Sequence, residues 1–111
     1  MAFDEALADR LRERLAAQRG VTEKKMFGGL AFLINGNMAV SASSQGGLLV
    51  HVDPGDGARF LKETGARPME MRGRKMEGWL RVDSSAVRTT RELDKWVRRG
   101  ADYAMSLPKK R

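Results

Sequence analysis

The sequence of 111 residues contains no cysteine, and this absence excludes disulfides, thiolate metal sites and cysteine nucleophiles together. Histidine is nearly absent too, since His51 is the only one. No apolar run is long enough to cross a membrane, and the first ten residues have neither the basic leader nor the apolar stretch of a secretory signal. We therefore expect a cytoplasmic protein that carries no metal and no cofactor.

The composition is that of a globular protein, with 41% hydrophobic and 32% charged residues. The length suits one domain, which we place at residues 1–108, followed by a basic tail at 109–111. The net charge of +7 is unevenly distributed. Residues 1–57 carry six Lys/Arg and seven Asp/Glu, a net −1, whereas residues 58–111 carry fifteen and seven, a net +8.

The spacing of apolar residues changes along the chain. Leucines four residues apart, at 7, 11 and 15, predict an amphipathic helix that Gly20 would stop. From Lys24 to Asp53 the pattern predicts a three-stranded meander. Asn35-Gly36 is a strong hairpin signal, because a type I′ turn needs positive φ at both central residues. This turn would place Phe32 opposite Ala39 and Leu33 opposite Met38.

A short helix is predicted over residues 56–64, and two short strands, 69–71 and 76–82, are predicted around a tight turn at Gly73-Arg74. The last helix would begin at a cap at Ser84 or Thr89 and end before Pro108, with one apolar side formed by Leu93, Trp96, Val97, Gly100, Ala104 and Leu107. The order α-β-β-β-α-β-β-α indicates a two-layer α+β fold with an antiparallel sheet.

The central strands are apolar on both sides. The first face would carry Leu30, Phe32, Ile34, Leu48, Val50 and Val52. The second face would carry Ala31, Leu33, Met38, Val40, Ala42 and Leu49. An antiparallel sheet with one wet face alternates more cleanly. Either a helix covers each face, or one face meets another protein or a second copy of this chain. The candidate protein interface is Leu33, Met38, Val40 and Leu49.

Basic residues form two candidate nucleic-acid surfaces. The predicted hairpin offers Arg72, Arg74, Lys75 and Arg81 with Trp79 as a stacking platform, and the last helix offers Arg91, Lys95, Arg98 and Arg99. A plainer interpretation is open for both. The helix cations are then an ordinary solvated face, and Trp79 packs under a helix or at a sheet edge.

Signatures of an enzyme are missing. A serine triad would need His51, but the predicted register places Ser41 and Ser43 on the opposite side of the sheet from it. We expect a protein that is not an enzyme, with no catalytic residue and no small-molecule substrate.

Three blocks of sequence carry a family resemblance. They are Thr22-Glu23-Lys24-Lys25-Met26-Phe27-Gly28-Gly29-Leu30-Ala31-Phe32-Leu33-Ile34-Asn35-Gly36-Asn37-Met38, then Arg67-Pro68-Met69 with Met76-Glu77-Gly78-Trp79 and Val82-Asp83, and lastly Trp96-Val97 with Ala101 to Pro108. In this order they closely resemble the N-terminal domain of the TfoX/Sxy family. The resemblance covers nearly the whole chain, which would be a stand-alone N-terminal domain without the C-terminal one.

The resemblance implies a fold similar to that of the type III secretion chaperones. It also implies a link to the transcriptional regulation of natural competence, in which these proteins assist a transcription activator. The expected function is thus a small non-enzymatic interaction module that contacts a protein partner or a second copy of itself. The alternative is a nucleic-acid-binding accessory protein that uses the basic hairpin and the last helix.

Overall fold

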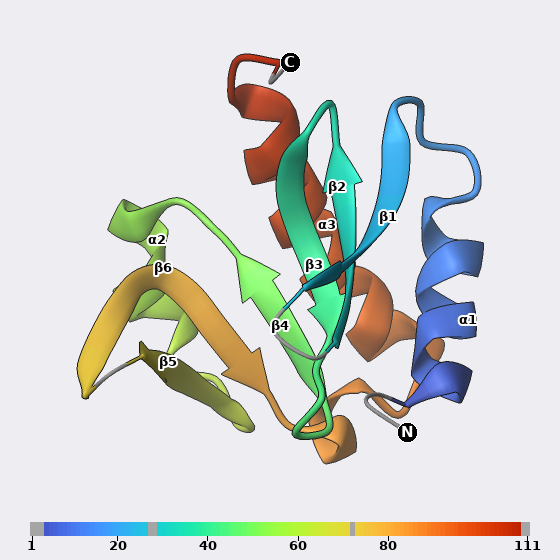
Figure 1. The fold of residues 1–111 in the computed structure, drawn as a ribbon. Helices are drawn as coiled ribbons and strands as arrows, with labels where there is room; N and C mark the ends of the chain where they lie inside the picture. The colour runs from blue at the N-terminus through green and yellow to red at the C-terminus, as the bar shows by residue number, and fades with distance from the viewer. Residues whose placement is uncertain (1–3, 27–28, 72, 110–111) are drawn as a thin grey trace.

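A computed structural model shows a six-stranded antiparallel sheet with three helices on one of its faces (Figure 1). It describes residues 4–26, 29–71 and 73–109. The helices are α1 (Glu5–Leu15), α2 (Pro54–Phe60) and α3 (Thr90–Ser106), with a 3-10 turn at Ser84–Val87. The strands are β1 (Val21–Met26), β2 (Gly29–Ile34), β3 (Asn37–Ala42), β4 (Leu48–His51), β5 (Ala66–Met71) and β6 (Arg74–Val82). Their order in the sheet, β1-β2-β3-β4-β6-β5, confirms the α+β class.

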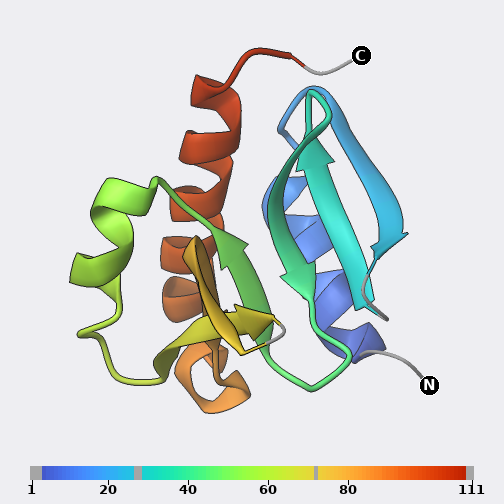
Figure 2. The same cartoon turned by 60° about the vertical axis from the view of Figure 1, so that its left-hand side comes forward.

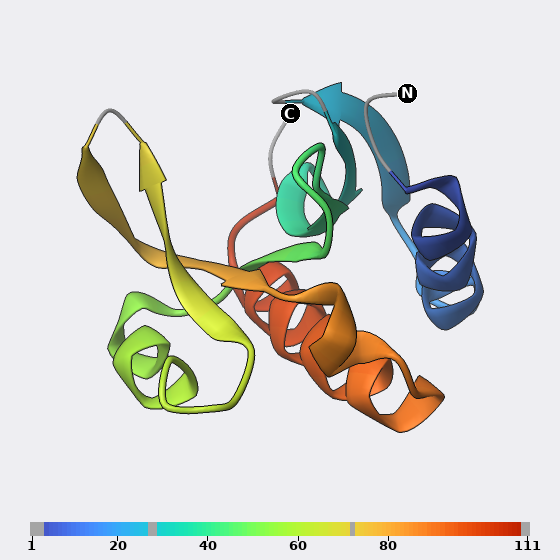
Figure 3. The same cartoon turned by 90° about the horizontal axis from the view of Figure 1, so that it is seen from below.

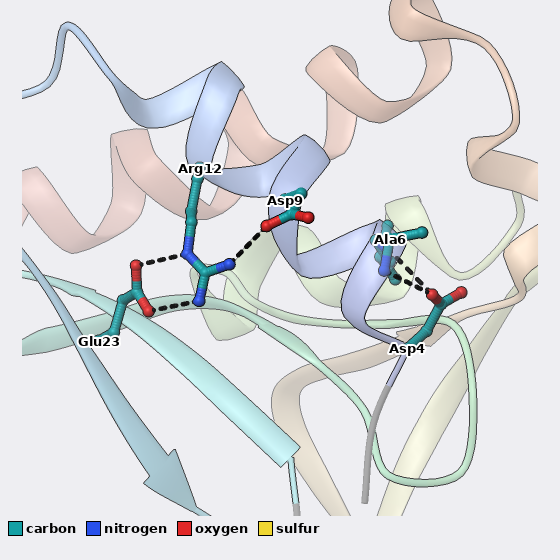
Figure 4. Close-up of polar contacts among 6 residues, drawn as sticks. Asp4, Ala6, Asp9, Arg12 and Glu23 are labelled. Atoms are coloured by element: carbon teal, nitrogen blue, oxygen red, sulfur yellow. Dashed lines mark hydrogen bonds and ion pairs between the residues drawn. The ribbon is translucent and has the colours of Figure 1, made fainter. Parts of the chain in front are cut away.

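Side-chain caps fix where the helices begin. The Asp4 carboxylate accepts hydrogen bonds from the backbone N–H groups of Ala6 and Leu7 at the start of α1 (Figure 4). Thr89 caps α3 in a capping box with Glu92, which decides between the two expected caps. Gly20 has a φ of +78°, but α1 already ends at Leu15, so the prediction that Gly20 stops this helix is wrong.

The meander has a fourth strand, β1, at its start. Asn35 (φ 53°) and Gly36 (φ 83°) form the β2–β3 turn, and Leu33 lies opposite Met38, as predicted. The next pair differs from the prediction, because Phe32 lies opposite Val40 and not Ala39.

Ala39 is therefore the extra residue of a β-bulge in β3. A bulge changes which face the following residues occupy. Val40 and Ala42, expected on the second face, consequently lie in the main core, where neither is exposed at all. The prediction that Val40 faces a partner is corrected on this ground.

The main core lies between the first face of the sheet and the helices. Figure 2 shows α1 and α3 side by side behind the strands. The residues predicted for this face, including Leu30, Phe32 and Val50, are buried there with the apolar sides of α1 and α3. Trp96 of α3 is the largest fully buried side chain, at 1% exposure.

One arginine fastens α1 to the edge of the sheet. The Arg12 guanidinium donates two hydrogen bonds to Glu23 of β1, at 2.8 and 2.9 Å, and a third to Asp9, at 2.6 Å (Figure 4). These bonds stabilise the ionised carboxylate and lower the pKa of Glu23 below its usual value.

A second network fastens α2 to α3. The carboxylate of Glu63, which follows α2, forms ion pairs with Lys95 Nζ at 2.8 Å and with Arg99 Nη2 at 2.7 Å. The Arg99 guanidinium also lies over the rings of Phe60 and Trp96, 4.1 and 4.6 Å from their centroids. The hydrogen bond from Arg99 is the main reason that the pKa of Glu63 is lowered.

The β5–β6 hairpin extends past the end of β4 as an arm (Figure 3). We call residues 70–77 the arm. Gly78 marks its base with a φ of +80°, and a Cβ there would lie 2.6 Å from the carbonyl oxygen of Val52. Met71 lies opposite Arg74, so the turn is one residue earlier than the predicted Gly73-Arg74 turn.

Both edges of the sheet carry residues that discourage the addition of another strand. Lys24 and Lys25 are exposed on the edge strand β1, and Pro68 lies in the other edge strand, β5. Lysine and proline at edge strands are common protections against pairing with another chain.

Candidate interaction surfaces

The second face of the sheet has its own apolar cluster, and none of the helices in the described part of the chain covers this face (Figure 3). Buried Ala31, Met38, Leu49 and Met69 form its floor, and partly buried Met26, Leu33 and Trp79 pack against them. Besides β2 and β3, the other four strands contribute to this cluster, through Met26 of β1, Leu49 of β4, Met69 of β5 and Trp79 of β6. Of the four residues predicted as an interface, Leu33, Met38 and Leu49 lie here.

This face is hollowed into a groove of about 720 Å³, which we call the trough. Its walls include Met26, Leu33, Met38, His51 and Trp79. Lys24 and Lys109 also line it, whereas none of the described residues that line it is acidic. The trough is thus apolar inside and positively charged at its rim.

The segment after α3 forms one end of the trough. Asn37, which is 2% exposed, donates a side-chain hydrogen bond of 2.9 Å to the carbonyl oxygen of Pro108. Leu107, Pro108 and Lys109 all line the trough. One buried amide therefore holds the end of the domain beside the second face.

His51 and Trp79 form a stacked pair across β4 and β6. Their ring centroids are 3.9 Å apart with an interplanar angle of 14°, and Tyr103 of α3 meets His51 edge-on at 4.9 Å. His51 Nδ1 lies 3.3 Å from the carbonyl oxygen of Met38. Trp79 is thus a half-buried side chain in the wall of the trough, and the His51 imidazole covers one side of its ring.

The bulge also corrects the predicted positions of the serines. Ser41 lies opposite Leu49, so it shares the second face with His51 instead of facing away from it. The Ser41 hydroxyl donates to the Leu30 carbonyl at 3.0 Å, and the Ser43 hydroxyl accepts from Arg81 at 3.1 Å. Each hydroxyl is thus engaged by a group other than the imidazole.

The candidate nucleic-acid residues do not form one surface. On α3, Lys95 and Arg99 pair with Glu63, and Arg98 pairs with Asp94 at 3.0 Å. Arg91 is exposed and has no ion pair among the described residues. α3 begins far from the tip of the arm (Figures 1 and 3).

On the hairpin, the arm exposes Arg74, Lys75 and Met76. Arg72 lies outside the described residues. Arg81 is half-buried on the second face, beyond the base of the arm. The described residues of the predicted set are therefore divided: Arg74 and Lys75 lie on the arm, whereas Trp79 and Arg81 lie on the second face.

Sequence reasoning missed several residues of the second face. Met26, Met69 and the contact of His51 with Trp79 depend on the pairing of β1 with β2, β4 with β6 and β5 with β6. The alternation of apolar residues around Met69 and Trp79 indicated two strands. It did not indicate which distant strand pairs with each of these two strands.

The comparison with protein families agrees with this architecture. The model of the TfoX N-terminal domain matches residues 13–104. The chain belongs to this family, which is one of non-catalytic domains. The comparison with curated proteins returned no match, and neither did the comparison with solved structures. Within the described residues, no helix has both the length and the apolar character needed to span a membrane.

Proposed function

We propose that this domain is a non-enzymatic regulatory module that acts in the cytoplasm by binding a partner protein in the trough. The observation that carries the proposal is the second face itself. It gathers apolar side chains from all six strands. Met26, Leu33 and Trp79 stay partly exposed there, because none of the described helices covers this face. Apolar surface of this kind typically marks an interaction site.

The charge of the trough favours a different protein over a second copy of this chain. Lys24 and Lys109 line the trough without a carboxylate among its described lining residues, and the chain carries a net +7. Two copies meeting through this face would bring like charges together. A partner with acidic and apolar side chains complements both properties of the surface.

Membership of this family supports a role for the module in transcriptional regulation. As the resemblance to TfoX and Sxy proteins implies, the partner would be a component of transcription activation, with natural competence as the regulated process. The protected edges of the sheet support contact through a face, in which side chains rather than an added strand recognise the partner.

Leu33→Glu is expected to weaken binding in the trough by about tenfold or more, because it removes apolar contact area and places a carboxylate on the partly exposed wall. The ligands would be peptides selected from a random display library on the wild-type chain, with affinities measured by fluorescence anisotropy. Circular dichroism would check that each variant is folded.

Met105→Glu is the matched control, because Met105 is 43% exposed on α3, away from the second face. It should change affinity by less than about twofold. Failure to select any binder, or equal binding to the Leu33→Glu chain, would refute the trough as a docking surface. Sedimentation showing a dimer that Leu33→Glu dissolves would assign the face to self-association instead.

Nucleic acid is a second candidate partner, favoured by the exposed cations of the arm. Arg74 and Lys75 have no ion pair among the described residues, and the exposed Met76 lies next to them. A two-stranded ribbon with cations near its tip fits a groove of duplex DNA. Replacing both cations with glutamine should lower affinity for a duplex of about 20 base pairs and reduce the salt slope by about two.

The matched control for the arm removes two exposed charges from another part of the molecule, by Arg14→Gln with Arg19→Gln. A chain ending at Pro108 tests the basic tail. If the control lowers duplex affinity as much as the arm variant does, or if binding vanishes with the tail, the arm is not a nucleic-acid surface.

A further inference from the structure

Arg81 is a half-buried arginine on the second face, and no described carboxylate pairs with it. It lies in β6 between Leu49 of β4 and Arg67 of β5. Its Nη1 donates a hydrogen bond of 3.1 Å to the Ser43 hydroxyl. Among residues 4–26, 29–71 and 73–109, no acidic side chain forms an ion pair with it.

The residue opposite Arg81 in the neighbouring strand has the same charge. Arg67 lies directly opposite it in the β5–β6 ladder, and like charges in such pairs are destabilising. Arg67 is neutralised by an ion pair with Asp83, whereas no acidic residue in the described part of the chain forms an ion pair with Arg81. A partly buried guanidinium loses hydration, and this cost is recovered only when hydrogen bonds and an opposite charge replace the lost water.

Arg81 lines a pocket of about 300 Å³. The pocket is also lined by Ser41, Ser43 and Gln45, and the Ser43 hydroxyl accepts from the Gln45 backbone N–H at 3.2 Å. The acidic residue on its lining, Glu70, is exposed and lies directly opposite Lys75 in the arm. A carboxylate entering the pocket would meet the fork of donors that a guanidinium presents.

The pocket and the trough lie on the same face and share Met26 as a lining residue. Leu49 and Met69 connect the pocket to the floor of the second face. The face therefore has an apolar centre, cations Lys24 and Lys109 toward one end, and Arg81 toward the other. The domain measures 31 × 30 × 27 Å, so an extended segment of about nine residues would span it.

We infer that Arg81 is an anion-binding residue that receives a carboxylate from an acidic, apolar-anchored segment of the partner protein. This inference rests on the proposed function and adds the side-chain chemistry that the docking face selects. A protein segment is favoured over nucleic acid because an apolar floor separates the cations, whereas a phosphate backbone needs cations in close succession. The His51 stack also covers one side of the Trp79 ring.

Peptides selected on the wild-type chain should carry aspartate or glutamate beside apolar residues. Arg81→Gln is expected to weaken their binding by about tenfold or more, since a hydrogen-bonded charge pair is lost. Replacing the peptide's acidic residue with its amide should weaken binding to the wild-type chain equally. This second change should have little further effect on the Arg81→Gln chain, because the two replacements remove the same interaction.

Arg67→Gln is the matched control, because it removes the same charge from the neighbouring strand, where Asp83 already neutralises it. Arg81→Lys, which keeps the charge but loses the fork, should give an intermediate affinity. Peptides that need Leu33 but bind equally to Arg81→Gln would overturn the inference and leave the docking face intact. The inference would also be overturned if the selected peptides contained no acidic residues. It would fail as well if Arg81→Gln weakened the binding of nucleic acid but not the binding of peptides.

Discussion

Trp96→Ala is expected to lower the free energy of unfolding by about 3–5 kcal/mol, the range for removing a large aromatic side chain from a core. Trp96 is 1% exposed and contacts Phe60 edge-on, with ring centroids 6.1 Å apart. Its ring also lies beneath the Arg99 guanidinium, so the substitution weakens the attachment of α2 to α3. A domain of this size is stabilised by about 5–15 kcal/mol in total, and much of that would be lost.

Urea denaturation followed by far-UV circular dichroism measures this change without depending on tryptophan fluorescence. Met105→Ala, on the same helix but 43% exposed, should change stability by less than about 0.5 kcal/mol. A loss below about 1 kcal/mol for Trp96→Ala would contradict the position of Trp96 at the centre of the main core.

Gly100→Ala is expected to destabilise the domain by about 1–3 kcal/mol, as overpacked core substitutions do. On an exposed helix the same change would stabilise by about 1 kcal/mol. Here a Cβ would overlap the carbonyl oxygen of Ala39 and lie 3.0 Å from Val40 Cγ1. The expected sign is therefore opposite to that of helix propensity, because α3 packs directly on the bulge in β3.

Asp102→Ala supplies the control for Gly100→Ala. Asp102 is exposed two residues further along α3, and the change should leave stability unaltered or raise it by up to about 0.7 kcal/mol. Stabilisation of both variants would mean that α3 and β3 are not in close contact at Gly100. Thermal unfolding of the two variants beside the wild-type chain gives the comparison.

Local sequence signals predicted the parts of the fold that neighbouring residues determine. Asn35-Gly36 specified its turn because both residues adopt positive φ, and Thr89 was one of two caps expected for the last helix, of which the structure shows Thr89. The apolar side of α3 was also predicted correctly, since residues such as Leu93 and Val97 are buried. These features depend on contacts within a few residues of each other.

The candidate interface was less predictable because one residue changes the alternation of β3. Strict alternation would place Val40 on the second face. The bulge at Ala39 instead directs the Val40 side chain into the main core. Nothing local marks this bulge. Its counterpart is Gly100, about sixty residues away in the chain, where the missing side chain leaves room for the Ala39 carbonyl.

Charge was predictable in amount but not in arrangement. The sequence places a net +8 in residues 58–111, yet the effect depends on distant partners such as Glu63, which pairs with Lys95 and Arg99. Arg81 differs from them only because no carboxylate lies within ion-pair distance among the described residues. Such differences follow from tertiary packing and are invisible to composition.

The hydrogen bond from Asn37 to the Pro108 carbonyl has a consequence for anything joined to the chain after residue 111. The bond holds the last described residues at the mouth of the trough, so a peptide fused there would start beside the docking face. Tethering gives a short linked ligand an effective concentration of about millimolar. A sequence that binds the trough with a Kd below about millimolar, when attached at this end, would therefore occupy the trough of its own domain and compete with a free partner.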